Sequence, residues 1–192
     1  MSIQEQRMGN TTRLFIAAPL PEELKQYLSE QASLYQDEAI RPIPLENLHL
    51  TLFFIGNVPE EQLSSIKQVT QHIASQSAAF DLRLEAIEPG PKQRSPRLVW
   101  ARFESSALFE QLSQSLTQAL SSAPPDTRKA IPHITLARFR KDRPAPRNLP
   151  VVEPEQSVTL QVREIAVWHS ELASPHPRYR ILESYPLGHN PS

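Results

Sequence analysis

The 192-residue chain contains no cysteine. This excludes disulfide bonds, thiolate nucleophiles and zinc sites built on cysteine. Glycine is scarce, with 4 residues, whereas proline is abundant, with 19. The sequence therefore has no glycine-rich phosphate-binding loop of the Walker type, and we expect loops that are stiffened by proline.

The sequence also lacks a strong net charge and a long apolar run. Its net charge is −1, so there is no bulk attraction to nucleic acid, and any such contact has to be local. Residues 1–12 are polar and do not resemble a signal peptide, and no stretch approaches the roughly 20 apolar residues of a membrane span. We therefore expect a cytoplasmic protein with no membrane partner.

One short pattern is present twice. The order histidine, apolar residue, threonine, apolar residue begins at His49 and again at His133. Because side chains alternate between the two faces of a strand, His49 and Thr51 share one face, as do His133 and Thr135. The apolar residues between them are explained as core residues. We interpret the pattern as two strands that face each other across a cleft, with two histidines acting on one phosphate.

The order of predicted elements favours an α+β fold. Strand and helix patterns are mixed without a regular βαβ rhythm, and the motifs lie about half a chain apart. We predict two pseudo-symmetric lobes of mainly antiparallel sheets that line a central cleft, with helices outside. A disordered tail is expected over residues 1–12, a single bilobed domain over 13–188 and a tail over 189–192. Trp100 and Trp168 fall in predicted strands and are expected in the core.

Two histidines can divide acid and base catalysis. Near neutral pH, an imidazole accepts a proton and an imidazolium donates one. Phosphodiester hydrolysis needs both steps, because the attacking water loses a proton and the leaving alkoxide gains one. The hydroxyls of Thr51 and Thr135 could hold the phosphate oxygens during in-line attack. This scheme requires no metal or other cofactor. A metal site on the imidazoles stays open as an alternative, although no carboxylates cluster near either motif.

Together with its flanking residues, the repeated motif resembles the 2H phosphoesterase superfamily. Within it, the sequence resembles the bacterial RNA 2′,3′-cyclic phosphodiesterases, which are also called 2′-5′ RNA ligases. The resemblance runs in order over roughly residues 13–187. It is carried by residues 13–17, 47–52 with Gly56, 98–100, 132–138 and 178–179.

The resemblance implies an enzyme that opens the 2′,3′-cyclic phosphate at an RNA end to leave a 2′-phosphate. It also implies reversible joining of RNA ends through a 2′-5′ linkage without ATP. By the same resemblance, His49 is the proton donor and His133 is the proton acceptor. The residues implied to bind the substrate are Thr51, Thr135, Arg138 and Phe54. RNA ends are the implied partner, and no cofactor or protein partner is implied.

Strand alternation leaves the orientation of two of these residues open. In a regular strand, Arg138 would point away from His133, and Phe54 would point away from His49. Either the strands bulge, as strands near active sites often do, or the two residues belong to the core and the surface. Other basic residues that could contact the RNA backbone are Arg94, Arg97, Arg140, Lys141, Arg178 and Arg180.

Two further functions stay open on the sequence alone. The first keeps the chemistry and changes the substrate to a small cyclic phosphate, such as ADP-ribose 1″,2″-cyclic phosphate, or to a 2′-5′ oligoadenylate. The second is a binding module for RNA ends that has lost catalysis. The intact His and Thr pairs argue against the second function.

Overall fold

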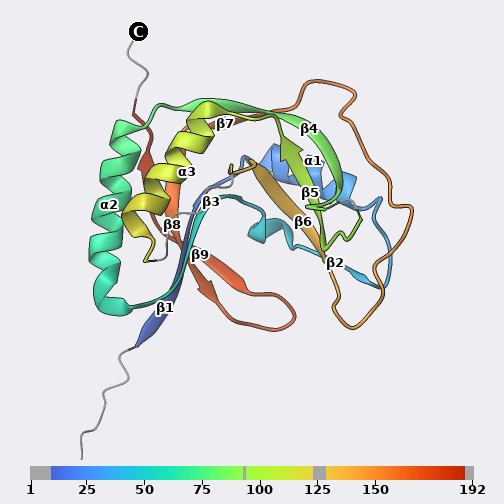
Figure 1. The fold of residues 1–192 in the computed structure, drawn as a ribbon, viewed down its shortest axis with the longest axis horizontal. Coiled ribbons are helices and arrows are strands. Elements are labelled where there is room, and N and C mark those ends of the chain that lie inside the picture. The colour runs from blue at the N-terminus through green and yellow to red at the C-terminus, as the bar shows by residue number, and fades with distance from the viewer. Residues whose placement is uncertain (1–9, 93, 123–128, 189–192) are drawn as a thin grey trace, which may run out of the picture.

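The chain folds into two antiparallel sheets and three α-helices in a computed structural model, which describes residues 10–92, 94–122 and 129–188 (Figure 1). The predicted α+β fold is thus confirmed. The four-stranded sheet has the order β3-β1-β8-β9 and the five-stranded sheet the order β2-β6-β5-β4-β7. No helix in the described part of the chain is long and apolar enough to cross a bilayer.

Each sheet contains one of the two motif strands. The four-stranded sheet consists of β1 (Thr11–Ala18), β3 (Leu50–Pro59), β8 (Glu164–Glu171) and β9 (Arg178–Pro186). The five-stranded sheet consists of β2 (Ile40–Pro42), β4 (Phe80–Gly90), β5 (Leu98–Phe103), β6 (His133–Phe139) and β7 (Thr159–Val162). Two short 3-10 helices, η1 (Leu45–Asn47) and η2 (Glu60–Gln62), flank β3.

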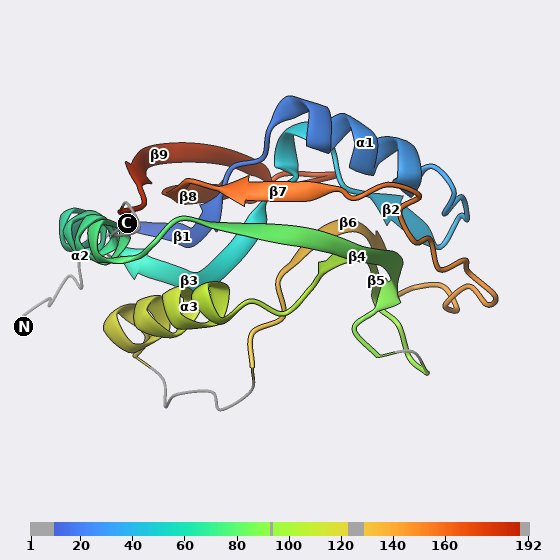
Figure 2. The same ribbon diagram turned by 90° about the horizontal axis from the view of Figure 1, so that it is seen from above.

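The three helices cover the two sheets unequally. They are α1 (Glu22–Ala32), α2 (Leu63–Gln76) and α3 (Ala107–Leu120). Both views show α2 and α3 side by side at one end of the molecule, where they pack on strands of the four-stranded sheet, whereas α1 packs on β6 at the other end (Figures 1 and 2). The hydroxyl of Ser106 accepts a hydrogen bond from the Phe109 amide at 3.3 Å and so caps α3.

One face of each motif strand lies in the hydrophobic core. Leu50 and Leu52 of β3 and Ile134 and Leu136 of β6 are buried in the same apolar cluster, as predicted. Burying side chains of this size contributes about 1.5–3 kcal/mol each. This burial orients both strands and turns their His and Thr side chains to the opposite side. We call that opposite side of each sheet its motif face.

The prediction of a disordered tail that extends to residue 12 is wrong at its end. β1 begins at Thr11, and Thr11 and Thr12 pair with Pro59 and Val58 of β3. The pairing uses backbone groups, and threonine is common in strands, so the polar character of these residues does not prevent it. The rest of the predicted tails, residues 1–9 and 189–192, lies outside the described residues.

Candidate active site

His49 and His133 stand at the N-terminal ends of β3 and β6 and are held in the same way. Nδ1 of His49 lies 2.7 Å from the carbonyl oxygen of Asn47, and Nδ1 of His133 lies 2.8 Å from that of Ile131. A carbonyl oxygen only accepts hydrogen bonds, so Nδ1 is the donor in both rings. In the neutral imidazoles, Nε2 is therefore left with a free lone pair for a reacting group.

Aromatic rings from three other strands surround His49. Its ring centroid lies 4.8 Å from that of Phe15, 5.6 Å from that of Trp168 and 5.3 Å from that of Tyr179, which is edge-on. Trp168 is itself fixed, because its Nε1 donates to the carbonyl of Ala17 at 3.1 Å. The apolar rings restrict the motion of the imidazole and reduce its contact with water.

A single tryptophan packs on His133. The ring centroids of Trp100 and His133 are 4.9 Å apart. Behind the indole lies Gly90, where a β-carbon would be only 2.6 Å from Cε2 of Trp100. Glycine at this position therefore lets the tryptophan lie close to the β4 backbone. Both tryptophans are buried, as predicted, but the sequence did not predict that they contact the histidines.

A β-bulge in β6 places Arg138 on the motif face. Thr135 pairs with Trp100 and Arg138 with Leu98 on β5, so three steps along β6 match two steps along β5. The extra residue is Leu136, which has no partner on β5. The bulge shifts the alternation by one residue, and Arg138 shares a face with Thr135.

An equivalent bulge in β3 places Phe54 on the motif face. Thr51 pairs with Ala17 and Phe54 with Phe15 on β1, which leaves Leu52 as the extra residue. The Phe54 ring is stacked with that of Phe15 at 6.3 Å, and the side chain is 49% exposed. About half of the Phe54 side chain thus remains exposed beside the aromatic cluster around His49.

The positive charge of Arg138 lowers the pKa of both imidazoles. Burial is the main reason why the pKa of His49 falls from 6.5 to about 4, and the charges of Arg138 and His133 lower this pKa further, against the hydrogen bond to Asn47. Burial also lowers the pKa of His133, and the charge of Arg138 lowers it further, against the hydrogen bond to Ile131. Both histidines are therefore neutral at pH 7 in the free protein. A bound anion would reverse part of this effect, because negative charge raises the pKa of an imidazole.

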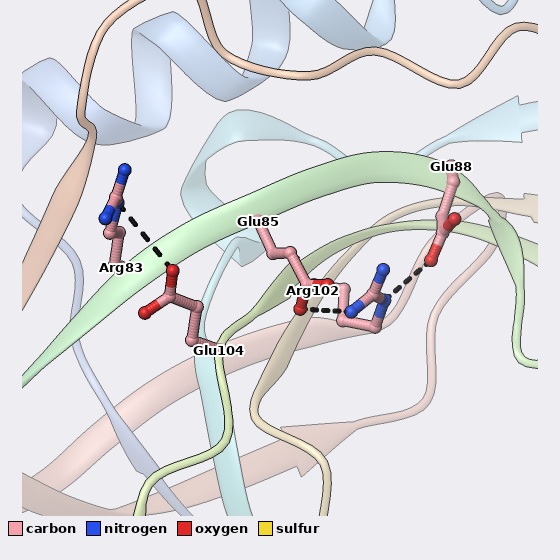
Figure 3. Close-up of polar contacts among 5 residues, drawn as sticks. All are labelled: Arg83, Glu85, Glu88, Arg102 and Glu104. Carbon is pink, nitrogen blue, oxygen red and sulfur yellow. Dashed lines mark hydrogen bonds and ion pairs between the residues drawn. The ribbon is translucent and has the colours of Figure 1, made fainter.

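A second arginine lies near His133 but is neutralised. Arg102 is directly opposite His133 on β5, and its Nε donates to Glu88 at 2.6 Å while Nη1 bonds to Glu85 (Figure 3). Within the described residues, Arg138 has no such carboxylate partner. Of these two arginines on the motif face, only Arg138 is therefore available to bind an anion.

The other basic residues singled out from the sequence are exposed and lie in loops or in β9. Arg178 and Arg180 pair with Glu171 and His169 of β8, on the face opposite to Trp168. The strand register therefore directs these two arginines away from His49. The remaining four are Arg94, Arg97, Arg140 and Lys141, all outside the strands.

A cavity of about 440 Å³ lies behind the motif strands. It is lined by residues of α1 and β2 and by Leu48 and Leu136, which belong to the core side. None of the predicted site residues lines it. No three His, Asp or Glu side chains among residues 10–92, 94–122 and 129–188 are grouped to hold a metal ion.

Comparisons with known proteins agree with the fold and with the family resemblance. The model of the 2′-5′ RNA ligase superfamily matches residues 18–173. An RNA 2′,3′-cyclic phosphodiesterase of Thermus thermophilus is 33% identical over 184 residues, which are 91% of this chain and 90% of the relative. An RNA 2′,3′-cyclic phosphodiesterase of Escherichia coli is 30% identical over 184 residues, which are 94% of this chain and 99% of the relative.

Solved structures show the same architecture. A crystal structure from Thermus thermophilus has a TM-score of 0.79 and 33% identity, and the match covers 92% of this chain and 98% of that one. Escherichia coli LigT complexed with 3′-AMP has a TM-score of 0.73 and 28% identity, and the match covers 94% of this chain and all of that one. The fold is therefore LigT-like.

Proposed function

The chain belongs to the 2′-5′ RNA ligase superfamily, and from this membership we propose that it is an RNA 2′,3′-cyclic phosphodiesterase with two catalytic histidines. The observation that carries the proposal is that His49 and His133 are held by the same kind of hydrogen bond. Each imidazole directs Nδ1 to a carbonyl two residues upstream, and Arg138 acts on both rings. Two equivalent nitrogens beside one cation suit a reaction on a phosphate that needs one acid and one base.

In the proposed reaction, water attacks the phosphorus of the cyclic phosphate and the bond from phosphorus to O3′ breaks. Nε2 of His133 takes the proton from the water, and Nε2 of His49 gives a proton to O3′. The product is a 2′-phosphomonoester with a free 3′-hydroxyl. A 5′-hydroxyl that attacks in place of water would form a 2′-5′ linkage by the same proton transfers, without ATP.

The charge of the substrate prepares His49 for its role as acid. In the free protein its pKa is about 4, so the ring is neutral at pH 7. A phosphate anion bound between the imidazoles raises this pKa and favours the protonated form that the leaving oxygen needs. In this scheme Arg138, Thr51 and Thr135 hold the non-bridging oxygens.

Phe54 is the proposed platform for the terminal base. Its exposed ring extends the stack that begins at Phe15, and the guanidinium of Arg13 lies 5.0 Å from its centroid. Stacking on an aromatic ring tolerates any base and contributes about 1–3 kcal/mol. We expect the protein to act in the cytoplasm on ends of RNA.

A phosphorus NMR time course tests the proposal. The substrate is a short RNA with a 2′,3′-cyclic phosphate, incubated in EDTA with the wild type, His49→Ala, His133→Ala or His72→Ala. His72 is an exposed histidine of α2 and serves as the matched control. A 2′-phosphate should appear with the wild type and with His72→Ala, and loss of either motif histidine should slow its formation by at least about 10²-fold.

The other outcomes each point to a different function. Full activity of both single variants would contradict the two-histidine scheme. Product that forms only after a divalent metal is added would make the histidines metal ligands. Tight RNA binding without turnover would favour the binding module, and turnover of small cyclic phosphates with no RNA activity would change the substrate.

A further inference from the structure

Two arginines lie directly opposite each other at the edge of the five-stranded sheet. Arg41 of β2 pairs with Arg138 of β6, and opposed residues of antiparallel strands share a face. Arg41 therefore belongs to the motif face, like Arg138. Like charges in this arrangement destabilise a sheet, so the pair needs a compensating anion or has a function that outweighs the repulsion.

Nothing in the described part of the chain neutralises this pair. Neither Arg41 nor Arg138 forms an ion pair there. Arg102, on the other side of β6, is bound by two glutamates instead (Figure 3). The positive charge of Arg102 beside His133 is thus compensated by carboxylates, whereas Arg41 and Arg138, at the edge formed by β2 and β6, have no carboxylate partner among the described residues.

The side chain of Arg41 reaches toward the other sheet. Its Nη1 donates to the carbonyl oxygen of Pro175 at 3.4 Å, and Pro175 lies in the loop between β8 and β9 of the four-stranded sheet. The guanidinium therefore lies against the loop that joins β8 and β9. Arg138 lowers the pKa of both histidines, whereas Arg41 is not among the charges that affect either. Arg138 lies on the same strand as His133, whereas Arg41 lies on the neighbouring edge strand β2.

We propose that Arg41 binds the phosphodiester that joins the last two nucleotides of the RNA, while Arg138 binds the cyclic phosphate. This inference rests on the proposed function and narrows its substrate class. The Cα atoms of an opposed pair are only about 4.5–5.5 Å apart, so two long side chains that diverge from them can contact consecutive phosphates. The favoured substrate is then an RNA end of at least two nucleotides, not a free cyclic nucleotide.

Three substrates separate the two phosphates. They are cytidine 2′,3′-cyclic phosphate, the dinucleotide CpC with a 2′,3′-cyclic phosphate, and the same dinucleotide with an uncharged methylphosphonate linkage. For the wild type, kcat/KM should be at least about tenfold higher on the charged dinucleotide than on the other two, mainly through KM. In Arg41→Gln this advantage should disappear, and the two dinucleotides should become equivalent. Arg41→Lys should keep part of it, because lysine retains the charge but not the fork of donors.

Arg143→Gln is the matched control, because Arg143 is an arginine on the loop after β6 that is paired with Glu38. It should keep the full preference for the charged dinucleotide. The melting temperature of Arg41→Gln should not fall below that of the wild type, since the substitution removes a repulsion between like charges.

The outcomes distinguish this inference from the proposed function. Failure of the wild type to hydrolyse any of the three substrates contradicts the proposed function itself. If kcat/KM of Arg41→Gln falls by the same factor on all three substrates, the result contradicts only the role of Arg41. The same holds if the wild type hydrolyses the methylphosphonate dinucleotide as efficiently as the charged dinucleotide.

Discussion

Leu52 and Leu136 are the extra residues of two equivalent β-bulges, each three positions after a motif histidine. Both side chains stay in the core, so the bulges do not interrupt the packing of the sheets. Their effect falls on the residues that follow, because Phe54 and Arg138 are turned onto the motif faces. The same local irregularity thus supplies each half of the candidate site with one further functional side chain.

Replacing Arg138 by methionine should lower kcat/KM on a cyclic-phosphate RNA by about 10- to 150-fold, the range expected for lost hydrogen bonds to a charged group. It should also raise the pKa of both His49 and His133 in the free protein, because the charge that disfavours their protonation is removed. Titration of the histidine ring protons by NMR measures both values, with His72 as internal reference. A fall of either pKa would contradict the placement of Arg138.

Both motif histidines should be in the Nδ1-protonated tautomer at pH 7.5, since each Nδ1 donates to a backbone carbonyl. In long-range proton–nitrogen spectra of histidine-labelled protein, Nε2 of both rings should have the shift of an unprotonated nitrogen. The exposed His72 should instead show averaged tautomers. A neutral ring protonated at Nε2 would contradict the hydrogen bond from Nδ1 to the backbone carbonyl at either position, and at His133 it would also remove the lone pair that the proposed base requires.

The free energy of unfolding should fall as the pH is lowered from 6.5 to 4. The pKa of His49 is about 4 in the folded state and near 6.5 in the unfolded chain, so the unfolded chain binds more protons in this window. The contribution is on the order of 3 kcal/mol, fully present above pH 6.5 and lost at pH 4. Denaturant titrations at several pH values should show that the free energy of unfolding depends less steeply on pH in His49→Gln than in the wild type.

Gly90→Ala should destabilise the protein by about 1–3 kcal/mol, because the new methyl group would overlap the Trp100 indole. The ring has to move, and the imidazole of His133 that packs on it should show changed chemical shifts and lower activity. Gly56→Ala is a useful contrast. Gly56 has a positive φ of 92° but open space around it, so its substitution should reduce stability without disturbing His133. Adding Trp100→Phe to Gly90→Ala should recover part of the lost stability.

The sequence was sufficient to predict which side chains of the motif strands face the core. Alternation is a local property, so the positions of Leu50 and Ile134 in the core followed from the order of residues alone. It was insufficient for Arg138 and Phe54, where alternation and family resemblance disagreed. The position of a bulge depends on the register with the partner strand. Residues 133–138 alone do not indicate which of them is left without a partner on β5.

The surroundings of His49 were also beyond sequence reasoning. Phe15 comes from β1, whereas Trp168 and Tyr179 come from the consecutive strands β8 and β9, far from β1 in the chain. Trp168 was expected in the core on the general behaviour of tryptophan, and it is buried, but its contact with the imidazole depends on the pairing of β1 with β8. Only the sheet order brings these rings together.

That pairing of β1 with β8 has a consequence for synthesis of the protein. In a nascent chain on the ribosome, Phe15 precedes His49, but Trp168 and Tyr179, which also surround the imidazole, are added only after the second motif. Until Trp168 and Tyr179 leave the exit tunnel, β1 lacks the second of its two neighbouring strands, and the imidazole is more open to water. A chain that has been synthesised only through the second motif therefore carries both motif histidines, but it lacks two of the aromatic rings that surround the first of them.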